Sequence, residues 1–397
     1  MKIWTPVPLA LCTLVAAYVP AASAQVKIGF IAELSGSQAM IGQDMLDGFM
    51  LAVDQQGGKL GGVAVDVLRR DSQLKPEVAT QIAEELLEKE RVPIIAGLSF
   101  SNIVMAIHKK VTSRQVFMVS GNAGPSPTAG AACSPFFYSA AKQNDQFAEA
   151  SGSYAKQQGY KQVIALAPNY QAGKDFVAGF KRNYGTALQD EIYTSLSQLD
   201  FSTEISRIGA AKPDAVYAFY PGANGVAFVK GYQQAGLLGK IPLLTNAAVD
   251  GTALPALKEV ALGVLNSANW GPDLPNAANR EFVAAFEAKF KRIPSEYAAQ
   301  SYDSAQLIGS ALKATGGNVT DKNKFAQALH AADFKSVRGN FKFNTNNYPI
   351  QDFYMFEVAK DAAGRVSLKT IGKPLPQSVD SFASQCKMPA ISSNSGA

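Results

Sequence analysis

The chain has 397 residues, of which 47% are hydrophobic and 17% charged, so it can bury a sizeable core and wholesale disorder is excluded. This length suits two domains of about 100–200 residues each better than one compact domain. The 37 basic and 32 acidic residues give a net charge of +5, which is too mild and too dispersed for a nucleic-acid-binding protein. Two histidines and three cysteines, without a CxxC or HExxH motif, exclude most zinc sites, and we expect no cofactor.

The first 24 residues have the pattern of a cleaved export signal. Lys2 gives a short positive end, a mostly apolar run at 7–19 follows, and Ala22-Ser23-Ala24 is a small-x-small cleavage pattern. A transmembrane anchor is the alternative, but flanking prolines limit the apolar stretch to about a dozen residues, too few to span a bilayer. We therefore expect the mature protein to begin at Gln25 and to reside in the periplasm.

Export determines which cysteines remain in the mature protein and whether they can be oxidised. Cys12 leaves with the signal, and Cys133 and Cys386 remain in an oxidising compartment. We expect these two to form a disulfide that ties the C-terminal tail to the body, with two buried free thiols as the alternative.

The mature sequence first alternates strands and helices in a regular order. Residues 26–31 form a nearly continuous apolar run, typical of a strand buried on both faces of a parallel sheet. Further strands are predicted at 63–68, 93–96 and 116–119, and helices at 42–56, 76–91 and 102–113. This is the pattern of a doubly wound α/β unit.

The same alternation restarts after a stretch rich in Pro, Gly and Ala at 121–135. Strands are predicted at 163–167, 215–219 and 242–244, and helices at 146–158, 174–184 and 225–235. Long helices at 279–290 and 297–314 and β-like runs at 340–343 and 353–358 follow. The pattern predicts an α/β protein of two lobes, each a doubly wound parallel sheet flanked by helices, with a ligand in the cleft at the carboxyl ends of the strands.

No short motif indicates an enzyme. The sequence has no GxGxxG after a strand, no GxxxxGK[ST] and no GxSxG. We interpret Asp44 and Asp47, three apart on a predicted helix, as surface charges. His108 and His330 lie near helix ends, where a basic residue suits the dipole. A secreted enzyme is the alternative, and it would need a base and a nucleophile in the cleft.

Polar turns follow two strands of the first unit. The turn at 98–102 opens a helix, and free N–H groups beside a serine hydroxyl suit a carboxylate. The alternative is that Ser101 only caps the helix. The turn at 120–125 offers further backbone donors at the same edge. The candidate binding residues of these two turns are Phe100, Ser101, Asn102, Asn122, Ala123 and Gly124.

Three turns follow strands of the second unit. Tyr170 and Tyr220 lie where a cleft wall is expected, although each could equally pack at the rim. Asn246 ends a third strand. The common placement of all five turns predicts one binding site between the lobes.

From residue 26 to about 358, the order of elements resembles the periplasmic solute-binding proteins of the Leu/Ile/Val-binding type, which serve ATP-driven importers. KIGFIAELSG at 27–36 resembles the family's first strand and turn. GQD at 42–44, followed by Gly48 and AVD at 52–54, resembles its first helix.

The resemblance implies a two-lobed Venus-flytrap fold of the type I periplasmic binding proteins, with three crossovers and a partner permease in the membrane. We assign 25–142 and 271–348 to lobe 1, and 143–270 and 349–397 to lobe 2. Because closure needs two free lobes, we expect a monomer. We also expect the protein to bind its ligand without catalysing a reaction.

Family members that bind amino acids hold the α-carboxylate at two first-lobe turns and the α-ammonium with an acidic side chain of the second lobe. The resemblance carries the carboxylate site over to 99–102 and 122–124. In the matching second-lobe stretch, Asn246-Ala247-Ala248, Ala247 stands where Glu is expected. A buried ammonium without a counter-charge costs roughly several kcal/mol, which argues against an α-amino acid.

We therefore expect a carboxylate with an aromatic body, such as a benzoate-like or cinnamate-like acid, walled by Phe100, Tyr170 and Tyr220. The turn at 122–127 also resembles a subgroup associated with aromatic-acid uptake. A branched-chain or other amino acid, an amide, and a soluble sensor that signals to a separate membrane receptor are the alternatives.

Overall fold

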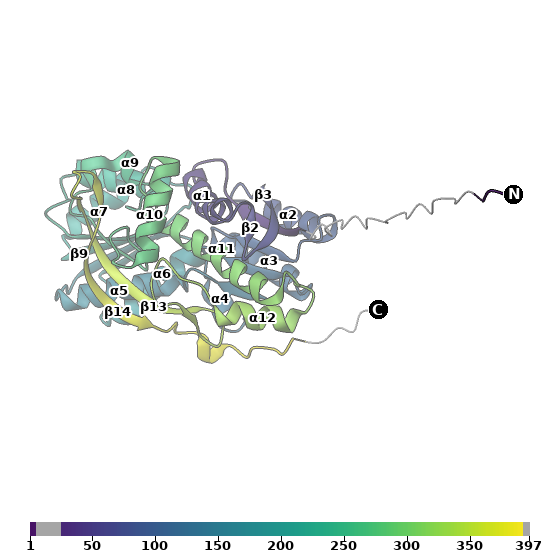
Figure 1. Cartoon of the computed structure of the whole chain (residues 1–397). Coiled ribbons are helices and arrows are strands. Elements are labelled where there is room, and N and C mark those ends of the chain that lie inside the picture. Colours follow the sequence, from purple (N-terminus) through teal and green to yellow (C-terminus); the bar gives the residue numbers. More distant parts are fainter. Residues whose placement is uncertain (5–24, 392–397) are drawn as a thin grey trace.

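The computed structural model describes residues 1–4 and 25–391. Most of the predicted signal peptide, including its cleavage site, lies outside the described residues. Between residues 25 and 391 the chain forms two α/β lobes, each built on one sheet (Figure 1). Across the described residues, every helix is too short or too polar to span a lipid bilayer.

The sheet of the first lobe has six strands within residues 25–391, in the order β2-β3-β1-β4-β5-β6. The strands are β1 (Val26–Ala32), β2 (Lys59–Leu60), β3 (Val63–Asp71), β4 (Ile94–Gly97), β5 (Phe117–Ser120) and β6 (Phe137–Ser139). All neighbours are parallel except the β2–β3 hairpin. The apolar run of β1 lies at the centre of this sheet, between β3 and β4, as expected for a strand buried on both faces.

The second sheet has the order β12-β13-β11-β10-β9-β7-β8, and β14 pairs with β13. Its strands are β7 (Val163–Pro168), β8 (Asp190–Thr194), β9 (Ala215–Phe219), β10 (Leu243–Asn246), β11 (Leu265–Ala268), β12 (Lys342–Phe343), β13 (Pro349–Lys360) and β14 (Val366–Ser378). The strands from β11 to β8 are parallel, as predicted, and the sheet becomes mixed at its edge, where β13 runs antiparallel to its neighbours β11, β12 and β14. The short β13–β14 connection can only join antiparallel strands.

Helices flank both sheets (Figure 1). In the first lobe they are α1 (Ala39–Gln55), α2 (Pro76–Glu88), α3 (Ser101–Ser113), α4 (Ser126–Ala129), α11 (Glu296–Thr315) and α12 (Lys322–Ala331). The others are α5 (Asn144–Gln157), α6 (Gln171–Tyr184), α7 (Ser202–Ala211), α8 (Ala223–Gln234), α9 (Leu254–Leu257), α10 (Ala277–Phe290) and the 3₁₀ turns η1 (Lys258–Ala261) and η2 (Ala383–Gln385). Helices α1 and α11 pack closely because Gly48 has no side chain: a Cβ there would lie 2.1 Å from the Ala298 carbonyl oxygen.

The described chain passes between the lobes three times, between β6 and α5, between β11 and α11, and between α12 and β12. Three crossovers and two sheets flanked by helices confirm the predicted Venus-flytrap fold. The exact lobe boundaries at residues 142, 270 and 348 stay a prediction.

The three crossovers meet at one buried carbonyl. The Ala141 oxygen, in the first crossover, accepts hydrogen bonds from Asn269 Nδ2 (2.8 Å), Gln351 Nε2 (2.7 Å) and Arg338 Nη1 (2.8 Å). Arg338 in turn pairs with Asp303 of α11 at 2.9 Å, with both side chains almost fully buried. The crossing segments are therefore held together at a single point.

A disulfide joins Cys133, in the first lobe, to Cys386, near the end of the described chain. The two cysteines are 253 positions apart, and the whole second sheet lies between them in the sequence. The bond fastens the C-terminal segment to the first lobe.

The ion pair at the crossovers gives a stability prediction. Replacing Arg338 by alanine leaves the Asp303 carboxylate buried without its partner, which should lower the free energy of unfolding by about 3–5 kcal/mol. Lys181→Ala breaks the exposed pair with Glu191 and should cost no more than about 1 kcal/mol. Urea unfolding of both variants measures this, and equal losses would contradict a special role for the buried pair.

Candidate functional site

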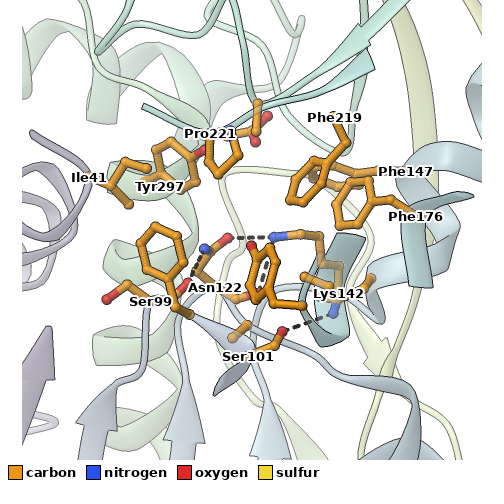
Figure 2. A pocket seen from close by; sticks show the side chains of 17 residues that line it. Ile41, Ser99, Ser101, Asn122, Lys142, Phe147, Phe176, Phe219, Pro221 and Tyr297 are labelled. Carbon is orange, nitrogen blue, oxygen red and sulfur yellow. Dashed lines mark hydrogen bonds between the residues drawn. The ribbon is translucent and has the colours of Figure 1, made fainter. Parts of the chain in front are cut away.

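One cavity lies between the lobes, at the carboxyl ends of the strands, and has a volume of about 30 Å³ (Figure 2). The first lobe contributes Ile41, Ser99, Phe100, Ser101, Asn122, Ala123, Glu296 and Tyr297. The first crossover and the second lobe contribute Lys142, Asn144, Phe147, Tyr170, Ala172, Phe176, Phe219, Pro221 and Ala247.

The turn after β4 presents the start of α3 to the cavity. Leu98 adopts a left-handed backbone (φ 67°), which turns the chain sharply after the strand. Helix α3 then begins at Ser101, after an N-cap, Phe100, that makes no side-chain capping bond. The alternative that Ser101 only caps the helix is therefore wrong. Its hydroxyl oxygen accepts from Asn144 Nδ2 at 3.0 Å and keeps its own hydrogen available to donate.

The second first-lobe turn differs from the expectation of free backbone donors. The Ala123 N–H donates to the Leu98 carbonyl at 3.0 Å, and the Gly124 N–H to Asn144 Oδ1 at 3.0 Å. The Asn122 N–H reaches Ser120 Oγ at 3.4 Å. The turn thus uses these N–H groups internally.

Lys142 supplies positive charge at this turn instead, and our sequence analysis missed it. Its Nζ donates to the Asn122 carbonyl (3.1 Å) and to Asn122 Oδ1 (2.5 Å), and lies 4.6 Å from the centre of the Phe147 ring (Figure 2). Only 4% of the residue is exposed, and burial lowers the pKa of the Lys142 ammonium to about 7. An anion beside Nζ would favour the charged form.

Glu296 and Tyr297, at the start of α11, also face the cavity and were not predicted. Both groups are buried. Among the described residues, neither the two carboxyl oxygens of Glu296 nor the hydroxyl of Tyr297 has a hydrogen-bond partner. Burial raises the pKa of Glu296 to about 8, while the charge of Lys142 opposes the rise. The sequence argument from Ala247 overlooked this acid: Ala247 does line the cavity, but a carboxyl group enters from another element.

Aromatic rings from both lobes form the walls. Phe100 of the first lobe faces Tyr170 of the second, with ring centres 6.4 Å apart. Tyr170 stacks on Phe219 at 6.3 Å, and Phe219 stacks on Phe176. The cavity is therefore flat-walled and apolar between its polar ends.

Five of the nine predicted binding residues line this cavity: Phe100, Ser101, Asn122, Ala123 and Tyr170. The remaining four, Asn102, Gly124, Tyr220 and Asn246, do not line it.

Asn102 turns toward the Leu74 carbonyl, and Gly124 is packed against the Lys142 carbonyl, where a Cβ would lie 1.9 Å away. Tyr220 points into the second lobe, where it accepts a hydrogen bond from Thr194 Oγ1 and packs on Phe201 and Phe228. Asn246 is fully buried, with its amide bonded to Ser267 and Tyr217. The side chains of Tyr220 and Asn246, which follow strands, therefore face the core of the second lobe.

The interpretation of Asp44 as a surface charge is wrong. The carboxylate is 2% exposed, pairs with Arg292 at 2.6 Å and accepts from Ser295. His108 is a buried residue against Phe137, and burial lowers its pKa to about 4. Neither histidine lines the cavity.

Direct contacts hold the lobes against each other. Gln38 of the first lobe donates to Asn224 of the second at 2.6 Å. Ser126, at the start of α4, donates its N–H and its hydroxyl to Asp175 of α6 at 3.1 and 2.7 Å. The structure therefore describes a closed form. Among the described residues, no group of three or more His, Cys, Asp or Glu side chains is arranged to hold a metal ion.

Two sheets, three crossovers and one cavity that both lobes bury define a Venus-flytrap binding protein. Residues 25–363 match the periplasmic binding protein family, and the chain belongs to that family. A relative in Brucella melitensis, named Leu/Ile/Val-binding protein homolog 6, is 31% identical over 359 residues, which cover 87% of this chain and 90% of the relative.

Solved structures of similar proteins agree with this family assignment. A solute-binding protein of an ABC transporter from Rhodopseudomonas palustris, in complex with benzoate, has a TM-score of 0.86 and 30% identity, covering 92% of this chain and 100% of the other. A second, from strain BisB5 in complex with 3,4-dihydroxybenzoic acid, has a TM-score of 0.82 and 27% identity over 90% and 99% of the two chains. A leucine-binding protein from Thermotoga maritima, at 20% identity and a TM-score of 0.77 over 87% and 99%, shares the fold.

The predicted family is thereby confirmed. The chain is an ABC-type substrate-binding protein, and its family works with a membrane permease on small-molecule ligands. Membership of the family implies a periplasmic location.

A buried acid beneath the cavity gives a pH prediction. Glu33 is fully buried, accepts from Ser72 Oγ (2.9 Å) and from the hydroxyl of Ser99, and burial raises its pKa from 4.5 to about 7. The folded state therefore holds this proton more tightly than the unfolded state. The stabilisation is full below pH 4.5 and is lost as the pH rises to about 7.

Relative to Glu33→Gln, the wild-type protein should thus lose roughly 2–3 kcal/mol of unfolding free energy between pH 5 and pH 8. Urea titrations at the two pH values measure the difference. Glu77→Gln, at an exposed position of α2, is the control and should show no such change. A constant gap between wild type and Glu33→Gln would contradict the prediction.

Proposed function

We propose that this protein captures an aromatic carboxylate between its lobes, as a monomer in the periplasm, and delivers it to the permease of an ABC importer. The observation that carries the proposal is the buried Lys142 ammonium, set between aromatic walls from both lobes. The benzoate and dihydroxybenzoate complexes of the two Rhodopseudomonas palustris proteins support this ligand class.

The carboxylate end of the ligand belongs beside Lys142. A buried cation is costly unless an anion accompanies it, and a ligand carboxylate would supply that anion. Ser101, whose hydroxyl oxygen accepts from Asn144, can donate its hydrogen, and the first N–H groups of α3, which receive no side-chain cap, are further donors on the same side. These groups keep the predicted turn at 98–102, and Lys142 takes the place of the predicted turn at 122–124.

The aromatic body of the ligand would pack against the rings. Phe100 and Tyr170 approach it from opposite lobes, and Phe219 and Phe176 extend the second-lobe wall. Such a site buries apolar area and favours flat rings through stacking. Because the two walls come together only on closure, the ligand stabilises the closed form by contacts that the open form lacks.

A branched-chain or other amino acid is the second candidate. The unpaired Glu296 carboxyl could serve as the counter-charge that Ala247 lacks, and the Brucella relatives are named Leu/Ile/Val-binding proteins. Phe100, Tyr170 and Phe219 favour the aromatic acid, because a branched aliphatic chain does not need three flat walls.

A ligand screen tests the proposal. We expect substituted benzoates and cinnamates, and not leucine, valine or simple amides, to raise the melting temperature of the ligand-stripped mature protein. At a hundred times its Kd, a ligand should add about 2.7 kcal/mol of stability, a shift of several degrees. Shifts with leucine or valine alone would contradict the proposal.

Lys142→Met removes the cation and keeps most of the chain length. We expect binding of aromatic acids to weaken by about 2–5 kcal/mol, measured by calorimetric titration. Lys174→Met, at an exposed position of α6, is the matched control and should change affinity by less than about 0.5 kcal/mol. Wild-type affinity in Lys142→Met would remove this residue from the site.

Tyr170→Ala removes one aromatic wall. We expect weaker binding by about 1–3 kcal/mol with a cooperative unfolding transition retained, because Tyr170 is only partly buried in the core. Tyr220→Phe, which changes a hydroxyl inside the second lobe, should leave affinity unchanged. The opposite ranking of these two variants would show that the cavity described above is not the binding site.

A further inference from the structure

The polar groups on the cavity wall divide into paired and unpaired sets. Asn122, Lys142 and Ser101 all have hydrogen-bond partners. Asn122 Nδ2 donates to the Ser99 carbonyl, Lys142 donates to Asn122, and Ser101 accepts from Asn144. Glu296 and Tyr297 have three polar atoms without a partner among the described residues. Buried polar atoms are almost always hydrogen-bonded, so this concentration at one end of a cavity calls for a ligand.

The two unpaired side chains cannot easily turn elsewhere. Ser295 caps α11 by accepting from the N–H groups of Tyr297 (3.1 Å) and Ala298 (3.4 Å), and its own N–H donates to Asp44. The same segment packs against Gly251, where a Cβ would lie 2.5 Å from the Pro294 carbonyl oxygen. The start of α11 is thus held from both lobes, with Glu296 and Tyr297 3% and 2% exposed.

The Tyr297 ring lies apart from the carboxylate end, whereas the neighbouring Glu296 carboxyl interacts electrostatically with the Lys142 ammonium. Figure 2 shows Tyr297 beside Ile41 and Pro221, across the cavity from Ser101 and Lys142. A ligand whose carboxylate meets Lys142 therefore directs its far end toward Tyr297.

We propose that Glu296 and Tyr297 form a second polar subsite, which binds a hydroxyl group on the far end of the ligand. The inference rests on the proposed function, since it takes the carboxylate end to be at Lys142. It narrows the ligand class to hydroxylated aromatic acids.

The chemistry of a phenolic hydroxyl matches the subsite. The hydroxyl can donate to a carboxyl oxygen of Glu296 and accept from the Tyr297 hydroxyl, so that both residues gain a partner. An ammonium group can donate to Glu296 and to the Tyr297 oxygen, but it has no acceptor, so the Tyr297 hydroxyl hydrogen would stay without a partner. A methyl group at the same place would leave all three atoms unpaired.

Calorimetric titration of the mature protein tests the subsite with matched ligand pairs: 4-hydroxybenzoate against 4-methylbenzoate, and 3-hydroxybenzoate against 3-methylbenzoate, with benzoate as the reference. We expect at least one hydroxybenzoate to bind about tenfold more tightly than its methyl counterpart. Tyr297→Phe and Glu296→Gln should each lower that ratio by at least about threefold and change benzoate affinity less.

Tyr302→Phe is the matched control, because Tyr302 lies on the same helix with its hydroxyl bonded to Gln55, and the ratio should stay at the wild-type value. Tyr297→Phe removes only an unpaired hydroxyl, so it remains informative even if Glu296→Gln fails to fold. Equal binding of each hydroxy and methyl pair, with benzoate bound, would overturn the subsite and leave the proposed function standing. Binding of L-leucine or L-valine alone would overturn both.

Discussion

The carbonyl oxygen of Ala141 is the point on which the two-lobed arrangement depends. Asn269, Arg338 and Gln351, which come from the later crossovers and their approaches, all donate to it. The next residue is Lys142, so the cation of the cavity sits directly beside the place where the lobes are joined. Gln300 links the two, since it donates to Asn269 at 2.9 Å and lies 3.4 Å from the Lys142 ammonium. The charge that faces the ligand is therefore positioned by the same hydrogen bonds that hold the crossovers.

The cavity has different chemistry at its two ends. The end near Lys142 is cationic and internally hydrogen-bonded, while the end near Tyr297 has a phenol without a partner among the described residues. Between them, Phe100 and Tyr170 from opposite lobes form flat walls. A rigid ligand that is polar at both ends and flat in the middle satisfies all three features at once. These features surround the ligand only in the closed form, so binding shifts the equilibrium between the open and closed forms toward the closed form.

Much of the fold could be predicted from the sequence, because each buried strand and amphipathic helix carries its own local periodicity. Strand β14 was missed because its polar, proline-containing sequence has no such pattern. Ser101 and Tyr170 were found because they follow predicted strands. Lys142 and Glu296 were missed because they lie on a crossover and at a helix start, and only the packing of distant segments brings them to the cavity. Tyr220 and Asn246 also follow strands, but their side chains face the interior of the second lobe, a choice that position along the chain does not settle.

The central claim is that one cavity holds an aromatic carboxylate with its charged end at Lys142. The most direct test is a crystal structure of the mature protein with 4-hydroxybenzoate bound. Our account predicts the carboxylate within hydrogen-bond distance of Lys142 Nζ, the ring against Phe100 and Tyr170, and the hydroxyl at Glu296 and Tyr297. A ligand bound outside this cavity, or bound with its carboxylate away from Lys142, would contradict the account.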